Sequence, residues 1–181
     1  TVLSSWLDNI PKAISEQMKA DWRAEAEFNQ ARDLLVMAVS AATAKRDVED
    51  LVGASAYKQM APESRDDLVA VLEMQKSGDP QWLAFRAIGM CRVFERELRA
   101  ALENRSGQWR PGDWAHGAMG QMLEACRRRL DETDRLCRVA RRALDSDLPG
   151  KRNAAAHGHR FSPHDLDLVE ALLFRDGLDG K

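Results

Sequence analysis

Residues 80–103, PQWLAFRAIGMCRVFERELRAALE, carry the strongest structural signal in the sequence. Asp79 is a favoured helix-capping residue, and proline at position 80 is well tolerated in a first helical turn. The apolar residues that follow recur at the three- and four-residue spacing of one helix face: Leu83, Ala87, Met90, Cys91, Phe94, Leu98 and Leu102. Trp82, Phe85 and Val93 widen this face, so the pattern predicts a central helix with neighbours on more than one side.

Upstream of this helix the sequence is also helical. An amphipathic stretch from Pro11 to about Ala61 predicts one long helix or two helices joined near Gly53. A second helix begins at Pro62, because the residue before a proline is pushed out of the helical region. Residues 77–80, with their glycine and proline, end it.

Three further helices are expected downstream. The spacing of apolar residues predicts one long helix over residues 113–144 and a short one over about 151–157. Ser162 and Pro163 open a closing helix. No strand pattern and no repeat of fixed period interrupts this order, so the predicted fold is all-α, with short connections that favour antiparallel neighbours.

The composition is that of an ordinary folded domain. The 181 residues are 44% hydrophobic and 31% charged, with 11 Gly and 6 Pro, which excludes collagen-like and strongly disordered classes. The net charge of -2 leaves nucleic-acid binding open, because local clustering decides it. Three cysteines without C-x-x-C spacing, and the lack of a signal-peptide or membrane-spanning pattern, predict reduced thiols and a cytoplasmic location. The start at Thr1 rather than Met favours a processed chain or an excised domain.

Residues 151–160, KRNAAAHGHR, gather polar side chains around three alanines. Histidine titrates near neutral pH and can exchange a proton with a ribose hydroxyl or a leaving oxygen. The planar guanidinium of arginine matches phosphate oxygens, and asparagine can donate to phosphate or orient the histidine. Arg152, Asn153 and His157 are therefore candidate catalytic residues for phosphodiester cleavage. The segment holds no Asp or Glu, which argues against a metal site built there.

Arg152 and His157 do not stack on one ideal helix. They are five residues apart, or roughly 140° around the helix axis, whereas Asn153 and His157 are one turn apart and share a face. Convergence requires that Gly158 turn the histidine or that a second copy of the segment approach. A plain helix end, with His157 near the last carbonyl groups, explains the same residues, and the residues alone leave both readings open.

The pattern Arg152-Asn153-x-x-x-His157 resembles the R-x-x-x-x-H signature of the HEPN superfamily, in its common form with Asn after the Arg. Gly158, the closing helix and the order of elements also resemble members of that group. The resemblance covers residues 59–174, of which the motif itself is six. It implies an antiparallel helical bundle over residues 59–181, preceded by a helical arm or linker over residues 1–58.

The same resemblance implies a function. Such domains form homodimers that place two motifs in one cleft, and many are metal-independent endoribonucleases without a cofactor. On that pattern Arg152 and His157 are catalytic, Asn153 assists, and the ribose 2′-oxygen attacks the adjacent phosphate of RNA to give a cyclic phosphate end. Toxin–antitoxin and antiviral-defence systems use such enzymes, so an antitoxin or an upstream regulatory domain is an expected partner. His159 stands where members controlled by tyrosine modification carry Tyr, which argues against that control.

Basic residues extend beyond the motif. Seven arginines between positions 127 and 142 face three acids, which predicts a phosphate-tracking surface. A solvated helix face with ion pairs one turn apart explains the excess equally well. The candidate RNA-binding residues are Lys151, His159, Arg160, Arg128 and Arg135.

Two other features have a functional and a structural interpretation. Trp109 and Trp114 could stack unpaired bases, although tryptophan at a helix entrance more often fills the core. Glu95 and Glu97 on the central helix could orient the motif, or could be surface acids.

The alternative function is a non-catalytic helical module of the same fold, which binds a partner protein or a nucleotide. A ribonuclease would cut RNA in the presence of a chelator and lose that activity in a folded His157→Ala variant. The module would leave RNA intact.

Overall fold

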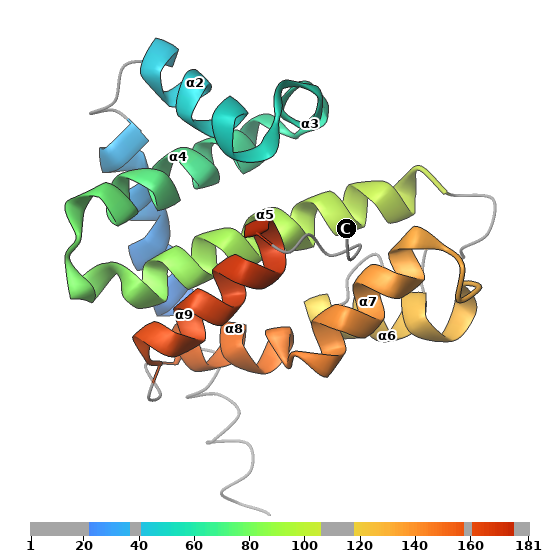
Figure 1. Cartoon of the computed structure of the whole chain (residues 1–181). Helices are drawn as coiled ribbons and strands as arrows, with labels where there is room; N and C mark the ends of the chain where they lie inside the picture. Colours follow the sequence, from blue (N-terminus) through green and yellow to red (C-terminus); the bar gives the residue numbers. More distant parts are fainter. Residues whose placement is uncertain (1–21, 37–40, 106–117, 158–160, 176–181) are drawn as a thin grey trace, which may run out of the picture.

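The computed structural model describes residues 22–36, 41–105, 118–157 and 161–175, and these ranges contain helices but no strand (Figure 1). The predicted all-α class is therefore confirmed. Among the helices of these ranges, none combines the length and the apolar character that crossing a membrane requires.

Helix α5 (Leu83–Glu103) is the centre of the molecule, as its wide apolar face predicts. It packs against α4, α6, α8 and α9. The expected start at Pro80 is a turn of 3-10 helix, η1 (Pro80–Trp82), whose Trp82 N–H donates to the Asp79 carbonyl over 3.1 Å. Proline fixes a backbone angle that suits this tighter turn equally well.

Helix α4 (Pro62–Ser77) precedes α5 and runs antiparallel to it (Figure 1). It begins at the predicted proline and ends at Gly78, whose φ of 66° lies in the left-handed region that favours glycine. The hairpin of α4 and α5 therefore follows directly from the turn residues between them.

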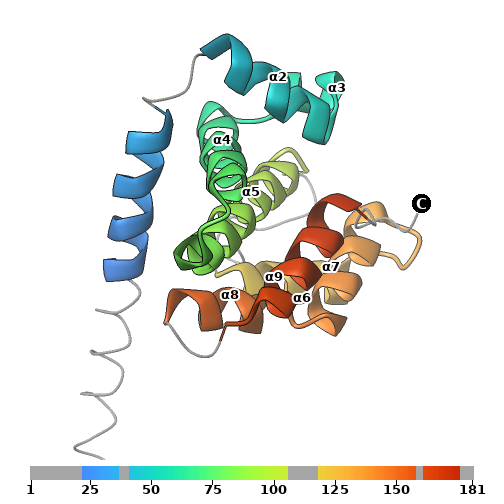
Figure 2. The ribbon, with the colours of Figure 1, turned by 60° about the vertical axis from the view of Figure 1, so that its left-hand side comes forward.

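The N-terminal stretch forms a helix over residues 22–36, then α2 (Ala41–Val52) and α3 (Ala54–Gln59). Gly53, with φ 84°, separates α2 from α3, so of the two predicted alternatives the helices joined near Gly53 are found and one continuous helix is not. The helix over residues 22–36 runs beside the ends of α4 and α5 (Figure 2). On this helix Trp22 is 73% exposed, whereas Phe28 is fully buried in the main core.

The predicted boundary at residue 59 does not coincide with a gap in packing. Val48 of α2 is fully buried against Leu68 of α4 and Val93 of α5 in a second apolar cluster. Gly89 of α5 lets Val71 of α4 and the Phe28 ring of the helix over residues 22–36 pack closely against α5. A Cβ atom at this position would lie 2.7 Å from Val71 and 2.9 Å from the Phe28 ring. The helix over residues 22–36, through Phe28, and α2, through Val48, thus both contribute to the core.

The single helix expected over residues 113–144 is wrong. The described part of this stretch forms two helices, α6 (Met119–Arg129) and α7 (Arg135–Asp145), which pack against each other as a hairpin. Asp134 caps α7 by accepting from the Leu136 N–H over 2.8 Å. A capping aspartate in the middle of an apolar periodicity is the signal that marks the break.

Helices α8 (Leu148–Ala156) and α9 (Pro163–Glu170) complete the fold, with a π-helical turn, η2 (Ala171–Arg175), after them. Ser162 caps α9, as predicted, and forms a capping box with Asp165. An ion pair between Arg86 and Glu170 ties α9 to α5.

Candidate functional site

The motif lies on α8, which packs across α5. The helix begins three residues earlier than predicted, because Pro149 is tolerated in a first turn. Gly150 fits this turn, since a Cβ atom there would lie 2.3 Å from the Asp147 carboxylate. The end agrees with the prediction: His157 is the C-cap, and its N–H donates to the Asn153 carbonyl over 3.0 Å.

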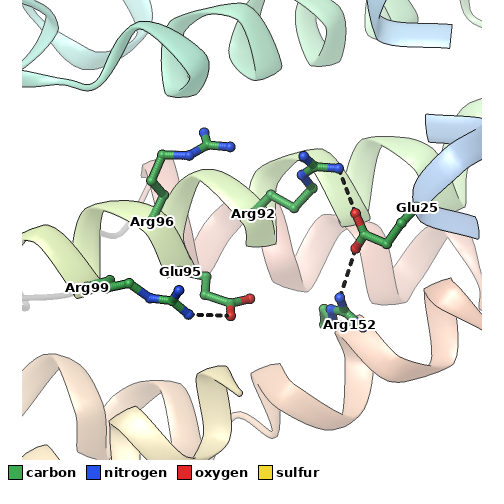
Figure 3. Close-up of a pocket in the computed structure, with 6 residues that line it drawn as sticks. All are labelled: Glu25, Arg92, Glu95, Arg96, Arg99 and Arg152. Atoms are coloured by element: carbon green, nitrogen blue, oxygen red, sulfur yellow. Dashed lines mark hydrogen bonds and ion pairs between the residues drawn. The ribbon is translucent and has the colours of Figure 1, made fainter. Parts of the chain in front are cut away.

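Arg152 extends from α8 into a cavity of about 300 Å³. Four guanidinium groups and two carboxylates line this cavity, which we call the arginine cavity: Arg92, Arg96, Arg99, Arg152, Glu25 and Glu95 (Figure 3). The lining therefore carries two more positive than negative charges. A concave, partly enclosed surface of this kind favours an anionic ligand.

Helix α5 supplies most of the lining. Arg92, Glu95, Arg96 and Arg99 follow one another at helical spacing, so they form one polar row along the helix. Arg99 donates to Glu95, one turn earlier, over 3.4 Å. This row is the signal that sequence reasoning missed, because only its glutamate was considered.

Two arginines of this row, Arg92 and Arg96, contact Asp67 of α4, whose side chain is fully buried. Arg96 donates to Asp67 over 3.0 Å and to the Ser64 hydroxyl over 3.2 Å. Arg32 donates to the Oδ1 atom of Asp67 over 3.3 Å. The Nε atom of Arg92 lies 3.7 Å from the Oδ2 atom, which also accepts from Arg96. Three guanidinium groups thus compensate one buried charge, and Asp67 holds Arg92 and Arg96 in place.

Glu25 reaches the cavity from the helix over residues 22–36. One carboxylate oxygen accepts from Arg152 over 2.9 Å and the other from Arg92 over 2.6 Å (Figure 3). Arg92 also donates to the Asn29 side chain over 2.9 Å, and its guanidinium lies 5.0 Å from the centre of the Phe28 ring. Nothing in the local sequence links Glu25 to a residue 127 positions away.

A second cavity, of about 420 Å³, adjoins the first. Arg152 and Glu95 line both cavities, and Asn153 faces only the second, together with the first turn of α6 and Pro149. The structure therefore brings two of the three predicted catalytic residues to one continuous surface.

His157 lines neither of these two cavities. It is half-buried and forms the C-cap of α8. The meeting of its side chain with Arg152 around one phosphate stays a prediction.

Lys151 has a clear structural partner. Its ammonium group lies 2.9 Å from Asp165, which also accepts from the Ser162 hydroxyl over 2.7 Å. The hydrogen bond from Lys151 and those from Ser162 hold the pKa of the Asp165 carboxyl well below its usual range. This lysine therefore links α8 to α9, and its predicted RNA contact stays a prediction.

The remaining predicted RNA-binding residues are dispersed. Arg128 lies on α6, exposed, 3.4 Å from Glu124, and Arg135 is exposed at the start of α7. His159, Arg160 and the loop with Trp109 and Trp114 lie outside the described residues.

Glu97 has a structural role: its carboxylate accepts from the Ala61 N–H over 3.2 Å at the start of α4. Cys91 lies under Arg152 in the interior. Burial raises the pKa of its thiol to about 12, against the opposing effect of the Arg152 charge, so the thiol stays neutral at physiological pH. All three cysteines are buried and free, as predicted.

Across the described ranges, no group of three or more His, Cys, Asp or Glu side chains is arranged to hold a metal ion. Comparisons of the chain with protein-family models, with curated proteins and with solved structures gave no match.

Proposed function

We propose that this protein is a metal-independent endoribonuclease of the HEPN type, acting as a toxin or an antiviral-defence effector. The observation that carries the proposal is the position of Arg152. The arginine of the R-x-x-x-x-H motif faces a cavity that three further arginines of α5 line.

The chemistry follows from the residue types. The arginines of the cavity bind backbone phosphates of single-stranded RNA, and Arg152 stabilises the charge that develops on the phosphate oxygens. An imidazole of His157 takes the proton of the ribose 2′-hydroxyl, whose oxygen attacks phosphorus. The bond to the 5′-oxygen breaks, that oxygen receives a proton, and the products are a cyclic phosphate end and a 5′-hydroxyl end.

A homodimer supplies the missing geometry in this proposal. Because Arg152 and His157 are five residues apart, or roughly 140° around the axis of an ideal helix, the motif of a second copy brings an imidazole to the first copy's arginine. The proposal therefore couples activity to association of two chains.

The test is cleavage of a labelled RNA by the purified protein with a chelator present. We expect cuts with cyclic phosphate ends, and a loss of at least about 100-fold in rate for His157→Ala, the usual contribution of a general acid or base. His164→Ala is the matched control, since His164 is exposed on α9. Circular dichroism and sedimentation verify that both variants are folded and associate like the wild type.

One observation favours a second candidate, a non-catalytic module that binds a partner protein or a nucleotide. In the single chain Arg152 is held by Glu25, and His157 lines neither cavity. The module predicts that wild-type protein leaves RNA intact and that His157→Ala unfolds, which is the opposite pair of outcomes.

A further inference from the structure

The Glu25 carboxylate stands between two guanidinium groups from different helices, Arg92 of α5 and Arg152 of α8. Each of its oxygens accepts one hydrogen bond, at 2.6 Å and 2.9 Å. Its own side chain is 30% exposed, so water reaches the pair. The carboxylate thus occupies the part of the arginine cavity where two strong donors converge.

Two arginines that converge on one oxyanion also suit a phosphate group. Phosphodiester and carboxylate each carry one negative charge and offer two oxygens to paired N–H donors. Arg92 has contacts besides Glu25: Asn29 and Phe28 on the same helix, and Asp67 of α4, whose carboxylate lies 3.7 Å from the Arg92 Nε atom. The contact with Asp67 keeps the Arg92 guanidinium at the cavity when the Glu25 carboxylate leaves.

We infer that Arg92 and Arg152 form a binding site for a backbone phosphate of RNA, and that Glu25 fills this site in the free protein. The inference rests on the proposed function in taking RNA as the ligand. RNA binding then requires exchange of one anion for another: the phosphate displaces the carboxylate of the helix over residues 22–36. Glu25 acts as an internal competitor of the substrate.

Charge supports the exchange. With Glu25 in place, four guanidinium groups and two carboxylates leave the cavity lining with two excess positive charges. Without it, four guanidinium groups face one carboxylate, which leaves three. Removal of Glu25 should therefore strengthen RNA binding beyond the effect of removing any other acid on the same helix.

The experiment compares Glu25→Gln with Glu27→Gln. Both changes remove one negative charge from the same helix, but Glu27 is exposed and lies outside the arginine cavity. The probe is a fluorescent 2′-O-methyl RNA, which has no free 2′-hydroxyl and so cannot be cut. Fluorescence anisotropy gives Kd as a function of salt concentration.

We expect Glu25→Gln to bind this RNA about five- to tenfold more tightly than wild type, and Glu27→Gln to stay within about twofold. The plot of log Kd against log salt should keep the wild-type slope, because the same phosphate contact forms in both proteins and only the competing carboxylate is removed. In the double variant Glu25→Gln with Arg152→Gln the gain should disappear, because one of the two donors is missing.

Equal affinity of the two glutamine variants would overturn the inference, as would a gain that survives the loss of Arg152. The cleavage assay tests the proposed function separately. Wild-type protein that never cuts RNA, combined with tighter binding by Glu25→Gln alone, removes the ribonuclease and keeps the phosphate site. Cleavage of RNA by the wild type, combined with identical RNA affinities of the two glutamine variants, keeps the ribonuclease and removes the phosphate site.

Discussion

Two regions of this molecule are rich in arginine, and they use it differently. In the α6–α7 hairpin the partners are near in sequence: Arg127 and Arg128 pair with Glu124, and Arg141 pairs with Glu132. On α5 the partners of Arg92 and Arg96 are 25 to 67 residues away, on α4 and on the helix over residues 22–36.

The difference shows that density of charge along the chain is a poor guide to a site. The hairpin arginines with local partners are at least 42% exposed, so water screens their ion pairs. The side chains of Arg92 and Arg96 are at most 28% exposed and are fixed by other helices. Arginines held by distant partners around a hollow are the ones positioned to bind a ligand.

The largest expected effect concerns the anchor of the α5 row. Asp67→Asn should lower the free energy of unfolding by about 3 kcal/mol, because it removes a fully buried carboxylate that faces three guanidinium groups. Urea denaturation measures the change. Asp66→Asn, at the exposed neighbouring position, is the control. If the two variants were equally stable, the α5 row would be held no more firmly than the hairpin.

The second prediction compares the two regions directly. Arg99 and Arg128 each lie 3.4 Å from a glutamate one turn earlier, so Arg99→Gln and Arg128→Gln each remove an ion pair of the same length and spacing. Of these two arginines, Arg99 lines the arginine cavity and Arg128 does not. We expect Arg99→Gln to weaken RNA binding about fivefold, or roughly 1 kcal/mol, and Arg128→Gln to change it less than twofold. The opposite order would place the RNA on the hairpin.

The third prediction concerns Asp165 of α9, the partner of Lys151 on α8. Asp165→Asn should cost about 1 kcal/mol of stability at pH 7, because it weakens the capping box and the contact with Lys151. The folded-state pKa of Asp165 is depressed, so its contribution is complete above the unfolded value near 4 and is lost as pH falls towards the folded value.

The stability difference between wild type and Asp165→Asn should therefore shrink between about pH 5 and pH 3. Asp167→Asn, exposed on the same helix, should show no such trend. A difference that stayed constant over this range would mean that Asp165 acts through packing rather than through its charge.

The smallest effect is expected in the hairpin. Glu132→Gln removes the partner of Arg141, yet Glu132 is 76% exposed, and such pairs contribute little to folding. Thermal unfolding should give the wild-type midpoint within error. A clear loss of stability would show that local pairs hold the hairpin as firmly as distant pairs hold α5.

The helices were predictable where local chemistry defines their ends. Pro62 and Gly78 bound α4, Gly53 separates α2 from α3, and Ser162 caps α9, each for a reason visible in a few residues. The break between α6 and α7 was missed because the apolar spacing continues across it, and only the capping role of Asp134 marks it.

The candidate site was predictable only in part. The motif indicated Arg152 and Asn153, which do line the two adjoining cavities. The contribution of Glu25, Asp67 and the α5 row depends on contacts between segments far apart in the chain, which no local pattern encodes. Which helices surround the arginines of α5 depends on how the helices pack against one another. A single sequence does not determine that packing.

Gly89 has a consequence for experiment. The ring of Phe28 rests on α5 at the one position where the helix has no side chain, and Phe28 is one turn from Glu25. Gly89→Ala would place a methyl group 2.9 Å from the Phe28 ring and 2.7 Å from Val71 of α4, so one or both of these neighbours must shift while every charge of the cavity stays in the protein. A single carbon atom thus offers a mechanical way to perturb the helix that carries Glu25, independent of any change in the chemistry of the carboxylate.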